Sequence, residues 1–481
     1  MNRYVRAVWK HASWPCLTLV SLALSGCVVG PNYHPPAAPT APAFTGSSAA
    51  PASRQQAIAY SDWWKVFQDP ELDALETEAD SADRDIRVSI NRVDEAIAGT
   101  GVARSYLFPT ISAQPSVGRT REAQTRPNNG NTGGRAATYN DYQLPLVMNY
   151  EIDAWGRVRR TVESARATEQ ASEADLRFVR LGTEAMVAID YYQLRETDQE
   201  LGVIESVLKD LQQSLDLTQQ LFDHGLNSDL EVSQAKTLLE QTAASEQTLR
   251  TQREQLVHAL AVLLGRTPES LNISAQPATL QPPAIPVGLP SDLLQRRPDI
   301  AEADRNVAAA TARIGIAKAA YFPQLSLTGT AGYESTNIGN LVNWQNTIAS
   351  LTSSAVAPIF NGGRLRAGVD QAQAIYRESL AQYEQTVLLS YQQVEDQLSA
   401  LHYLATQSQL QNLAVQDAAR AAKIAADQYK RGLVSYLNVV TAQQIVLFNE
   451  RTATQISGQR LVASVVLIKA LGGGWAQTKT P

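Results

Sequence analysis

The chain has 481 residues, more than one ordinary hydrophobic core accommodates, and this length predicts two domains or two repeats. Its 41 basic and 47 acidic residues give a formal net charge of -6, which argues against a nucleic-acid-binding protein with a basic face. The two cysteines, Cys16 and Cys27, exclude a disulfide framework and a cysteine-based zinc site, and the five histidines are scattered, so the composition gives a metalloenzyme little support.

Residues 1–26 have a basic start and a short apolar run, and this pattern predicts a secretory signal peptide. The run is too short to cross a bilayer as a helix. Small residues then precede Cys27, as in a bacterial lipoprotein signal, so we expect Cys27 to become a lipidated N-terminus. The alternative is a buried cysteine that follows a leader by coincidence. Val28 stands where an aspartate would favour inner-membrane retention, so transfer to the outer membrane is expected.

Residues 27–61 are rich in Pro, Ala and Ser, a composition that cannot bury enough apolar surface to fold alone. We interpret this segment as an extended tether between the lipid and the folded body.

The rest of the chain contains an internal duplication. Residues 103–118 (ARSYLFPTISAQPSVG) align with residues 317–332 (AKAAYFPQLSLTGTAG) at an offset of 214, whereas Gly156 aligns with Gly363 at an offset of 207. The offset changes only across a polar loop that is longer in the first repeat, and loops tolerate insertions. The predicted organisation is a first repeat at 62–275, a Pro-rich link at 276–290, a second repeat at 291–473 and a tail at 474–481.

Each repeat carries two stretches in which apolar and polar residues alternate, a pattern that predicts strands with one apolar and one polar face. The expected strands are about 110–118, 139–152, 324–333 and 347–360. A soluble sandwich could show the same alternation. In a bilayer, however, strands must close into a barrel, and four strands are too few to close. A transmembrane interpretation therefore requires several chains, and three chains would supply twelve strands.

Long helical stretches follow the strands in both repeats. Residues 157–222 and 364–431 contain no proline, and at 1.5 Å per residue each could form a rod on the order of 100 Å long. Return helices are expected at roughly 229–264 and 435–471. An apolar stripe with heptad-like spacing indicates packing between neighbouring helices.

The segments between these helices, residues 223–230 and 430–437, share the pattern Gly-Leu-x-Ser-x-Leu. A glycine that ends one helix, followed by a serine N-cap that starts the next, predicts the tip of a tight helical hairpin. The matching positions are Gly225, Leu226, Ser228 and Leu230 in the first tip, and Gly432, Leu433, Ser435 and Leu437 in the second.

The chain resembles the TolC-like outer membrane efflux proteins, specifically the NodT-type lipoprotein branch that serves resistance-nodulation-division pumps. The resemblance covers nearly the whole mature chain. It rests on DWWKVFQDPELDALETEA (62–79), LLQRRPDIAEAD (293–304), IGIAKAAYFPQLSLTG (314–329) and the two tips.

The resemblance implies an α+β membrane protein that forms a homotrimer. Twelve strands, four from each chain, would make a transmembrane β-barrel in the outer membrane, and a long α-helical coiled-coil barrel would continue it across the periplasm. The implied partners are a periplasmic adaptor protein and an inner-membrane resistance-nodulation-division pump, and no cofactor is implied.

The resemblance also assigns roles to the tips. It implies an apolar constriction at Leu437, with Asn438 and Thr441 nearby. Relatives often carry an acidic residue at the position of Thr441, so Asp229 and Glu231 of the first tip are expected to supply the negative charge. The implied adaptor contacts are Gly225, Leu226, Ser228, Leu230, Gly432, Leu433 and Ser435.

The expected function is therefore a passive duct that exports small toxic compounds. The sequence contains no nucleotide-binding loop, no G-x-S-x-G motif and no histidine cluster that would support an enzyme. One alternative is a duct for type I protein secretion. The alternative from another class is a periplasmic adaptor, although an adaptor would have one helical hairpin inside a split β domain.

Overall fold

The computed structural model describes residues 28–39, 44, 62–123, 138–276, 281–283, 285, 293–294 and 296–473. The expected signal peptide, Cys27, most of the expected tether, most of the Pro-rich link and the tail at 474–481 lie outside the described residues. Within the described part of the chain, no helix combines the length and apolar character needed to cross a membrane.

The chain divides into two compact units. The sheet unit comprises the described residues of Met1–Pro36, Asp94–Ala171 and Ala303–Gln382, and the hairpin unit comprises those of Ala37–Val93, Ser172–Glu302 and Tyr383–Pro481.

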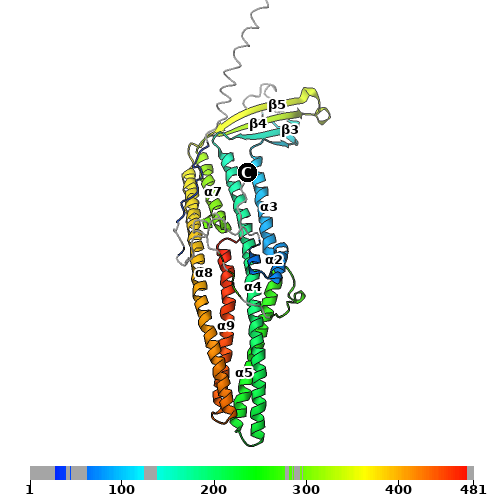
Figure 1. The fold of residues 1–481 in the computed structure, drawn as a ribbon. Coiled ribbons are helices and arrows are strands. Elements are labelled where there is room, and N and C mark those ends of the chain that lie inside the picture. The colour runs from blue at the N-terminus through cyan, green and yellow to red at the C-terminus, as the bar shows by residue number, and fades with distance from the viewer. Residues whose placement is uncertain are drawn as a thin grey trace, which may run out of the picture. The chain divides into compact units, whose positions relative to one another are not determined.

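An antiparallel sheet organises the sheet unit (Figure 1). Its strands are β1 (Thr110–Ala113), β2 (Ser116–Arg121), β3 (Thr138–Ile152), β4 (Gln324–Ser335) and β5 (Thr347–Val356). Both β1 and β2 pair with β3, which pairs with β4, which pairs with β5. The β3–β4 pairing thus joins the two repeats. Two short 3-10 helices, η4 (Ile338–Asn340) and η5 (Trp344–Asn346), lie in the loop between β4 and β5.

The first expected strand, 110–118, is divided in the structure. β1 and β2 keep one register along β3, since Ala113 lies opposite Leu146 and Ser116 lies opposite Gln143. The interruption falls at Gln114 and Pro115, where proline has no N–H to offer a ladder. The sheet therefore has four strand positions, although five strands occupy them.

The last expected strand, 347–360, is shorter in the structure. β5 ends at Val356, where its ladder with β4 ends at the pair Gln324–Val356. Residues 357–360 have no strand beside them in the described chain, and Ile359 is 99% exposed.

The register confirms the alternation of the two faces over residues 110–117, 142–152 and 324–331. Elsewhere the faces are mixed, because Arg119 and Arg121 share the face of Val117, and Ile348 and Val356 share the face of Ser354. Directly opposed residues in an antiparallel ladder share a face of the sheet. The apolar face carries Ile111, Val117, Leu144, Leu146, Met148, Ile152, Leu325, Leu327, Ala331 and Leu351. The opposite face carries Ser112, Ser116, Gln143, Asn149, Glu151, Ser326, Thr328, Thr330, Ser350 and Ser354.

Helices lead into and out of the sheet. α3 (Arg84–Ser105) precedes β1 and α7 (Pro298–Ala319) precedes β4, whereas α4 (Arg157–Asp223) follows β3 and α8 (Arg364–Lys430) follows β5. Asp153 caps the start of α4, because its carboxylate accepts hydrogen bonds from the N–H groups of Val158 at 3.0 Å and Arg159 at 2.9 Å.

The hairpin unit contains α5 (Asp229–Leu263) and α9 (Tyr436–Ala470), the return helices of the two hairpins (Figure 1). It also contains α2 (Pro70–Ala82) and two short 3-10 helices, η2 (Trp63–Phe67) and η3 (Pro268–Ser270). Asp69 caps α2 by accepting hydrogen bonds from the N–H groups of Glu71 and Leu72, and Pro70 occupies the first turn, where its missing N–H costs nothing.

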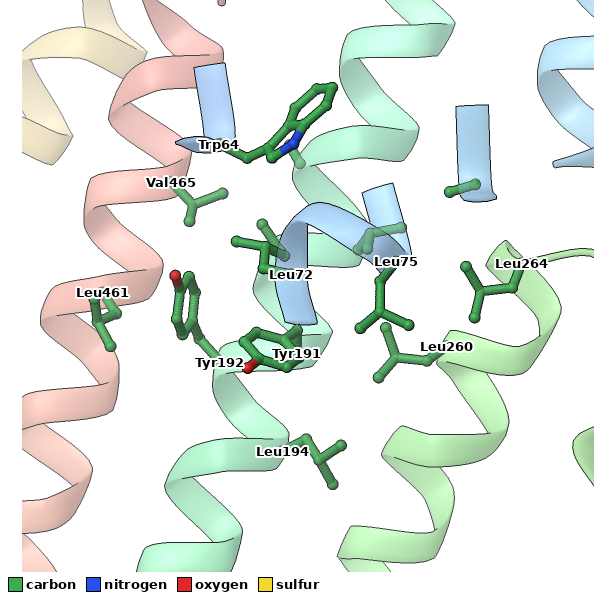
Figure 2. Close-up of a cluster of buried hydrophobic side chains, with 14 of the residues drawn as sticks. Trp64, Leu72, Leu75, Tyr191, Tyr192, Leu194, Leu260, Leu264, Leu461 and Val465 are labelled. Atoms are coloured by element: carbon green, nitrogen blue, oxygen red, sulfur yellow. The ribbon is translucent and has the colours of Figure 1, made fainter. Parts of the chain in front are cut away.

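The largest core of the hairpin unit gathers side chains from η2, α2, α4, α5 and α9. Figure 2 shows Leu72 and Leu75 of α2 lying among side chains of the three longer helices. Leu72, Leu194, Leu260 and Val465 are 0% exposed. Burial of such side chains contributes about 1.5–3 kcal/mol each, so this core holds α2 against the long helices.

Two buried arginines hold chain segments to this unit. Arg195 is 1% exposed and donates to Asp198 at 3.0 Å, to the carbonyl of Ser274 at 2.8 Å and to Glu71. Arg297, in the RRPDI motif, is 5% exposed and donates to the carbonyl of Ala470 at 2.8 Å and to Gln393 at 2.9 Å. The second arginine of the motif therefore ties the segment before α7 to α8 and α9.

Candidate functional site

The first hairpin tip connects α4 to α5. Gly225 has a φ of +70°, its N–H donates to the carbonyl of Phe222 at 2.8 Å, and the N–H of Leu226 donates to the carbonyl of Leu221 at 2.8 Å. This pair of bonds is a Schellman ending, which places its positive φ on a residue without a Cβ. Ser228 then takes the extended N-cap conformation, although its side chain makes no capping hydrogen bond.

The second tip repeats this geometry between α8 and α9. Gly432 also has a φ of +70°, and its N–H donates to the carbonyl of Tyr429 at 2.8 Å. The N–H of Leu433 donates to the carbonyl of Gln428 at 3.0 Å, and Ser435 is extended without a side-chain cap. The turn itself lies outside both helices, at residues 224–228 and 431–435, so it is shorter than the eight-residue segments expected from the sequence.

An apolar cluster joins the two hairpins behind their tips. Tyr436, at the start of α9, is 2% exposed and packs with Leu211 of α4 and with Ala235 and Leu238 of α5. The ring of Tyr429 lies 5.2 Å from that of Tyr436, between ring centroids.

Polar contacts join the same two hairpins next to this cluster. The hydroxyl of Tyr429 accepts a hydrogen bond from Asn227 Nδ2 at 2.6 Å and donates one to Glu231 Oε2 at 3.3 Å. Farther from the tips, Gln443 Nε2 donates to Ser214 Oγ at 3.3 Å, and Arg451 Nη2 lies 3.2 Å from Glu200 Oε2. The arrangement holds the second hairpin to the first through side chains and leaves the tips themselves in solvent.

The leucines singled out from the sequence are exposed at the tips. Leu226 is 71% exposed, Leu230 65%, Leu433 69% and Leu437 53%. Four exposed leucines at two neighbouring turns offer a surface for another protein or for the same residues of another copy. Gly225, Gly432, Ser228 and Ser435 are exposed as well.

The polar residues expected near the constriction differ in their surroundings. Asp229, Asn438 and Thr441 are exposed, and the Thr441 hydroxyl donates to the carbonyl of Leu437 within α9 at 2.9 Å. Glu231 is half-buried and engaged by Tyr429.

Tyr429 and Asn227 are not among the tip residues to which the sequence assigned a role. A signal was available, because Tyr429 occupies the position that Phe222 holds in the first repeat. The hydroxyl is the difference between these two side chains, and it is the group that bonds Asn227 and Glu231.

In the sheet unit, the residues that follow Cys27 are bound along α4 and α7. The N–H of Val29 donates to the carbonyl of Trp155 at 3.1 Å, and Arg160 Nη2 donates to Asn32 Oδ1 at 2.8 Å. The hydroxyl of Tyr33 donates to Asp304. Gly156 permits this path, because a Cβ there would lie 2.9 Å from the side chain of Val28. The start of the expected tether forms no helix or strand, and these hydrogen bonds fix it to the sheet unit.

Among the described residues, no three His, Cys, Asp or Glu side chains are grouped so that they could hold a metal ion.

Comparison with known proteins identifies the family. The model of the outer membrane efflux protein family matches residues 75–266 and 289–473, one segment for each repeat. The solvent efflux pump outer membrane protein SrpC of Pseudomonas putida is 34% identical over 475 residues, which cover 97% of this chain and 99% of SrpC. The outer membrane protein OprJ of Pseudomonas aeruginosa is 31% identical over 468 residues and 96% of both chains.

Solved structures agree with this assignment. The outer-membrane channel OprN superposes with a TM-score of 0.87 at 32% identity, over 93% of this chain and all of the other. The open state of the MtrE outer membrane channel of Neisseria gonorrhoeae superposes with a TM-score of 0.81 at 25% identity, over 93% of this chain and 98% of MtrE. The α+β fold expected from the sequence is confirmed, and a periplasmic adaptor is excluded. The chain therefore belongs to the outer membrane efflux protein family and is an outer-membrane efflux channel, not an enzyme.

Proposed function

We propose that three copies of this chain form a passive duct, closed at rest by the hairpin tips and opened by a periplasmic adaptor protein. The observation that carries the proposal is the two-faced sheet with two unpaired edges. Among the described strands, β5 pairs only with β4, and β1 and β2 pair only with β3.

The sheet suits a bilayer only if its edges are paired. Lipid leaves no water to satisfy edge N–H and C=O groups, so each edge needs a strand from another copy. Four strand positions per chain give twelve in a trimer, within the range of closed outer-membrane barrels. The apolar face, with Ile111 69% and Leu351 72% exposed, would face lipid. The hydroxyl- and amide-rich face would line the water-filled lumen.

Cys27 would be lipidated and add an acyl anchor in the outer membrane. The hydrogen bonds that hold Val29 and Asn32 to the sheet unit support this role, because they fix the chain immediately after the cysteine.

The tips would form the periplasmic gate. Leu437 is the candidate constriction, flanked by Asn438 and Thr441, with Asp229 of the first tip as the exposed acid. The Tyr429 hydroxyl would keep the second hairpin beside the first in the closed state, because it bonds both Asn227 and Glu231.

The exposed tip leucines support contact with an adaptor. Leu226, Leu230 and Leu433 are more than 60% exposed, with Gly225, Ser228, Gly432 and Ser435 beside them. The adaptor would in turn connect the duct to an inner-membrane resistance-nodulation-division pump.

The exported compounds would be small and toxic. Proteins similar to this chain are named for the efflux of solvents and of toluene, for an antibiotic efflux pump and for a cation efflux system. These names favour small-molecule efflux over type I protein secretion.

Reconstitution tests the proposal. Protein extracted from outer membranes and added to planar lipid bilayers is expected to give discrete conductance steps. Protein that is recovered from the outer membrane, is folded by circular dichroism and yet yields no conductance would contradict the duct.

A further inference from the structure

The internal duplication relates the strand pairings of the two repeats. Adding 214 to the number of a residue in β1 or β2 gives the equivalent residue of β4 in the second repeat. Adding 207 to the number of a residue in β3 gives the equivalent residue of β5. Within the first repeat, Thr110 pairs with Asn149. The two offsets carry this pair to Gln324 and Val356, which pair in the second repeat. The offsets therefore transfer a register from one repeat to the other without a slip.

A second register joins the repeats within one chain. The end of β3 lies beside the start of β4, with Ile152 opposite Leu325. The counterpart of Ile152 in the second repeat is Ile359, and the counterpart of Leu325 in the first repeat is Ile111. Ile111 lies in β1 at one edge of the sheet, and Ile359 follows β5 at the other edge. The two residues therefore cannot pair within one chain while the sheet is open.

We propose that β5 and the residues after it pair antiparallel with β1 and β2 of the neighbouring protomer, in the register transferred from the β3–β4 junction. In this register Ile359 lies opposite Ile111, Ser354 opposite Ser116, and Ala349 opposite Arg121. The register rests on the proposed trimer and adds to it the atomic pairing of the interface.

The end of β5 supports this register. β3 continues to Ile152, beyond its last pair with β1, because β4 accompanies it. The corresponding residues 357–359 have no strand beside them among the described residues of one chain, and Ile359 and the following Phe360 are 99% and 91% exposed. The neighbouring β1 would supply the strand that these residues lack.

The position of Pro358 is compatible with the same pairing. Gln114, between β1 and β2, donates its N–H to the carbonyl of Pro145, so this carbonyl points toward the β1 and β2 side of β3 and not toward β4. Glu151 lies six residues later and has the same orientation. Pro358 is the counterpart of Glu151, so its missing N–H would point away from the neighbouring protomer. Pro115 follows Gln114, so its missing N–H would point toward the neighbouring protomer, and the interface between protomers would lack that one hydrogen bond.

Ser116 and Ser354 are suited to a test by disulfide formation. Backbone N–H and C=O groups alternate in direction along a strand, so in the proposed register those of Ser116 and Ser354 point away from each other. The two residues then form a pair without mutual backbone hydrogen bonds, at a Cα separation of about 4.5 Å. That separation lies within the range of roughly 4.4–6.8 Å that disulfides require. Both side chains are small and lie on the polar face of the sheet.

The experiment uses the full-length double variant Ser116→Cys/Ser354→Cys, oxidised with copper phenanthroline in outer membranes and analysed on heated, non-reducing gels. Covalent dimers and trimers are expected, which vanish on reduction and are absent from either single variant. The matched control is Val147→Cys/Thr330→Cys, the equivalent pair at the observed β3–β4 junction. It should close within one chain and produce no higher band.

Two shifted pairs decide the register. Ser354→Cys is combined with Gln114→Cys in one variant and with Gly118→Cys in the other. Each of these pairs would be directly opposed only if the true register differed from the proposed one by two residues. If a shifted pair cross-links better than the proposed one, or if none cross-links while unheated gels retain a trimer, the register is overturned and the trimer survives. If the control closes but unheated gels show only monomer, the trimer itself fails.

Discussion

Asn227, in the first hairpin tip, donates a hydrogen bond from Nδ2 to the hydroxyl of Tyr429 on α8 at 2.6 Å. The two residues are 202 positions apart and belong to different hairpins. The same hydroxyl donates to Glu231 at 3.3 Å, so one phenol group joins the turn of the first tip and the start of α5 to the second hairpin.

Removing this hydroxyl should favour the open gate. Each hydrogen bond contributes about 0.5–1.5 kcal/mol, so Tyr429→Phe is expected to shift the closed–open equilibrium toward open by about tenfold. Single-channel recording would show more time in large-conductance states. Tyr403→Phe, 70% exposed on the same helix, is the control and should behave as wild type. Identical gating in Tyr429→Phe and wild type would contradict the role of this hydroxyl.

Shortening Leu437 should widen the closed tip. Its side chain is 53% exposed, so Leu437→Ala should have little effect on folding and should raise the conductance of the resting channel. Leu433→Ala, at a 69% exposed position of the same tip, should weaken the response to the adaptor but leave the resting conductance unchanged. An unchanged conductance for Leu437→Ala would remove this residue from the constriction.

Replacing Cys27 should abolish lipidation. Cys27→Ser is expected to lose incorporation of radioactive palmitate, because the other cysteine, Cys16, lies inside the expected leader and follows Trp14 and Pro15 instead of small residues. Persistent labelling would show that the anchor lies elsewhere.

Glu76, on α2, should make the stability of the hairpin unit depend on pH. It is 0% exposed, and neither carboxylate oxygen has a hydrogen-bond partner among the described residues. Burial, followed by the nearby Glu184, raises its pKa to about 10. The folded protein therefore retains a proton that the unfolded chain releases near pH 4.5. The free energy of unfolding should fall as the pH rises between these values, by at most about 1.4 kcal/mol per pH unit.

Glu76→Gln preserves the shape and removes the titration. The variant should melt at a higher temperature than wild type at pH 8 and show a flatter pH dependence, whereas Glu95→Gln on the exposed face of α3 should change neither. Some slope should remain, because burial also raises the pKa of Glu184 to about 7. Equal slopes in Glu76→Gln and wild type would show that Glu76 does not hold the proton.

Local chemistry explains the features that the sequence predicted well. Gly225 and Gly432 carry a positive φ that other residues rarely adopt, so the glycine-leucine pair alone indicates where each long helix ends. The strand faces follow from alternation, which the register of β3 and β4 reproduces residue by residue.

The features that the sequence did not predict depend on contacts between distant residues. Composition predicts an extended segment after Cys27, but it does not show that the buried Arg160 binds Asn32. Likewise, no local pattern relates Tyr429 to Asn227. The division of the first strand at Pro115 was visible in principle, because proline cannot donate to a ladder.

The most direct test of the central claim is the mass of the intact complex. Native mass spectrometry of protein extracted from outer membranes in mild detergent counts the copies in each particle. Three copies of the mature chain, carrying covalent lipid, are the predicted result. A single copy, or a particle with an even number of copies, would contradict a duct built from three chains.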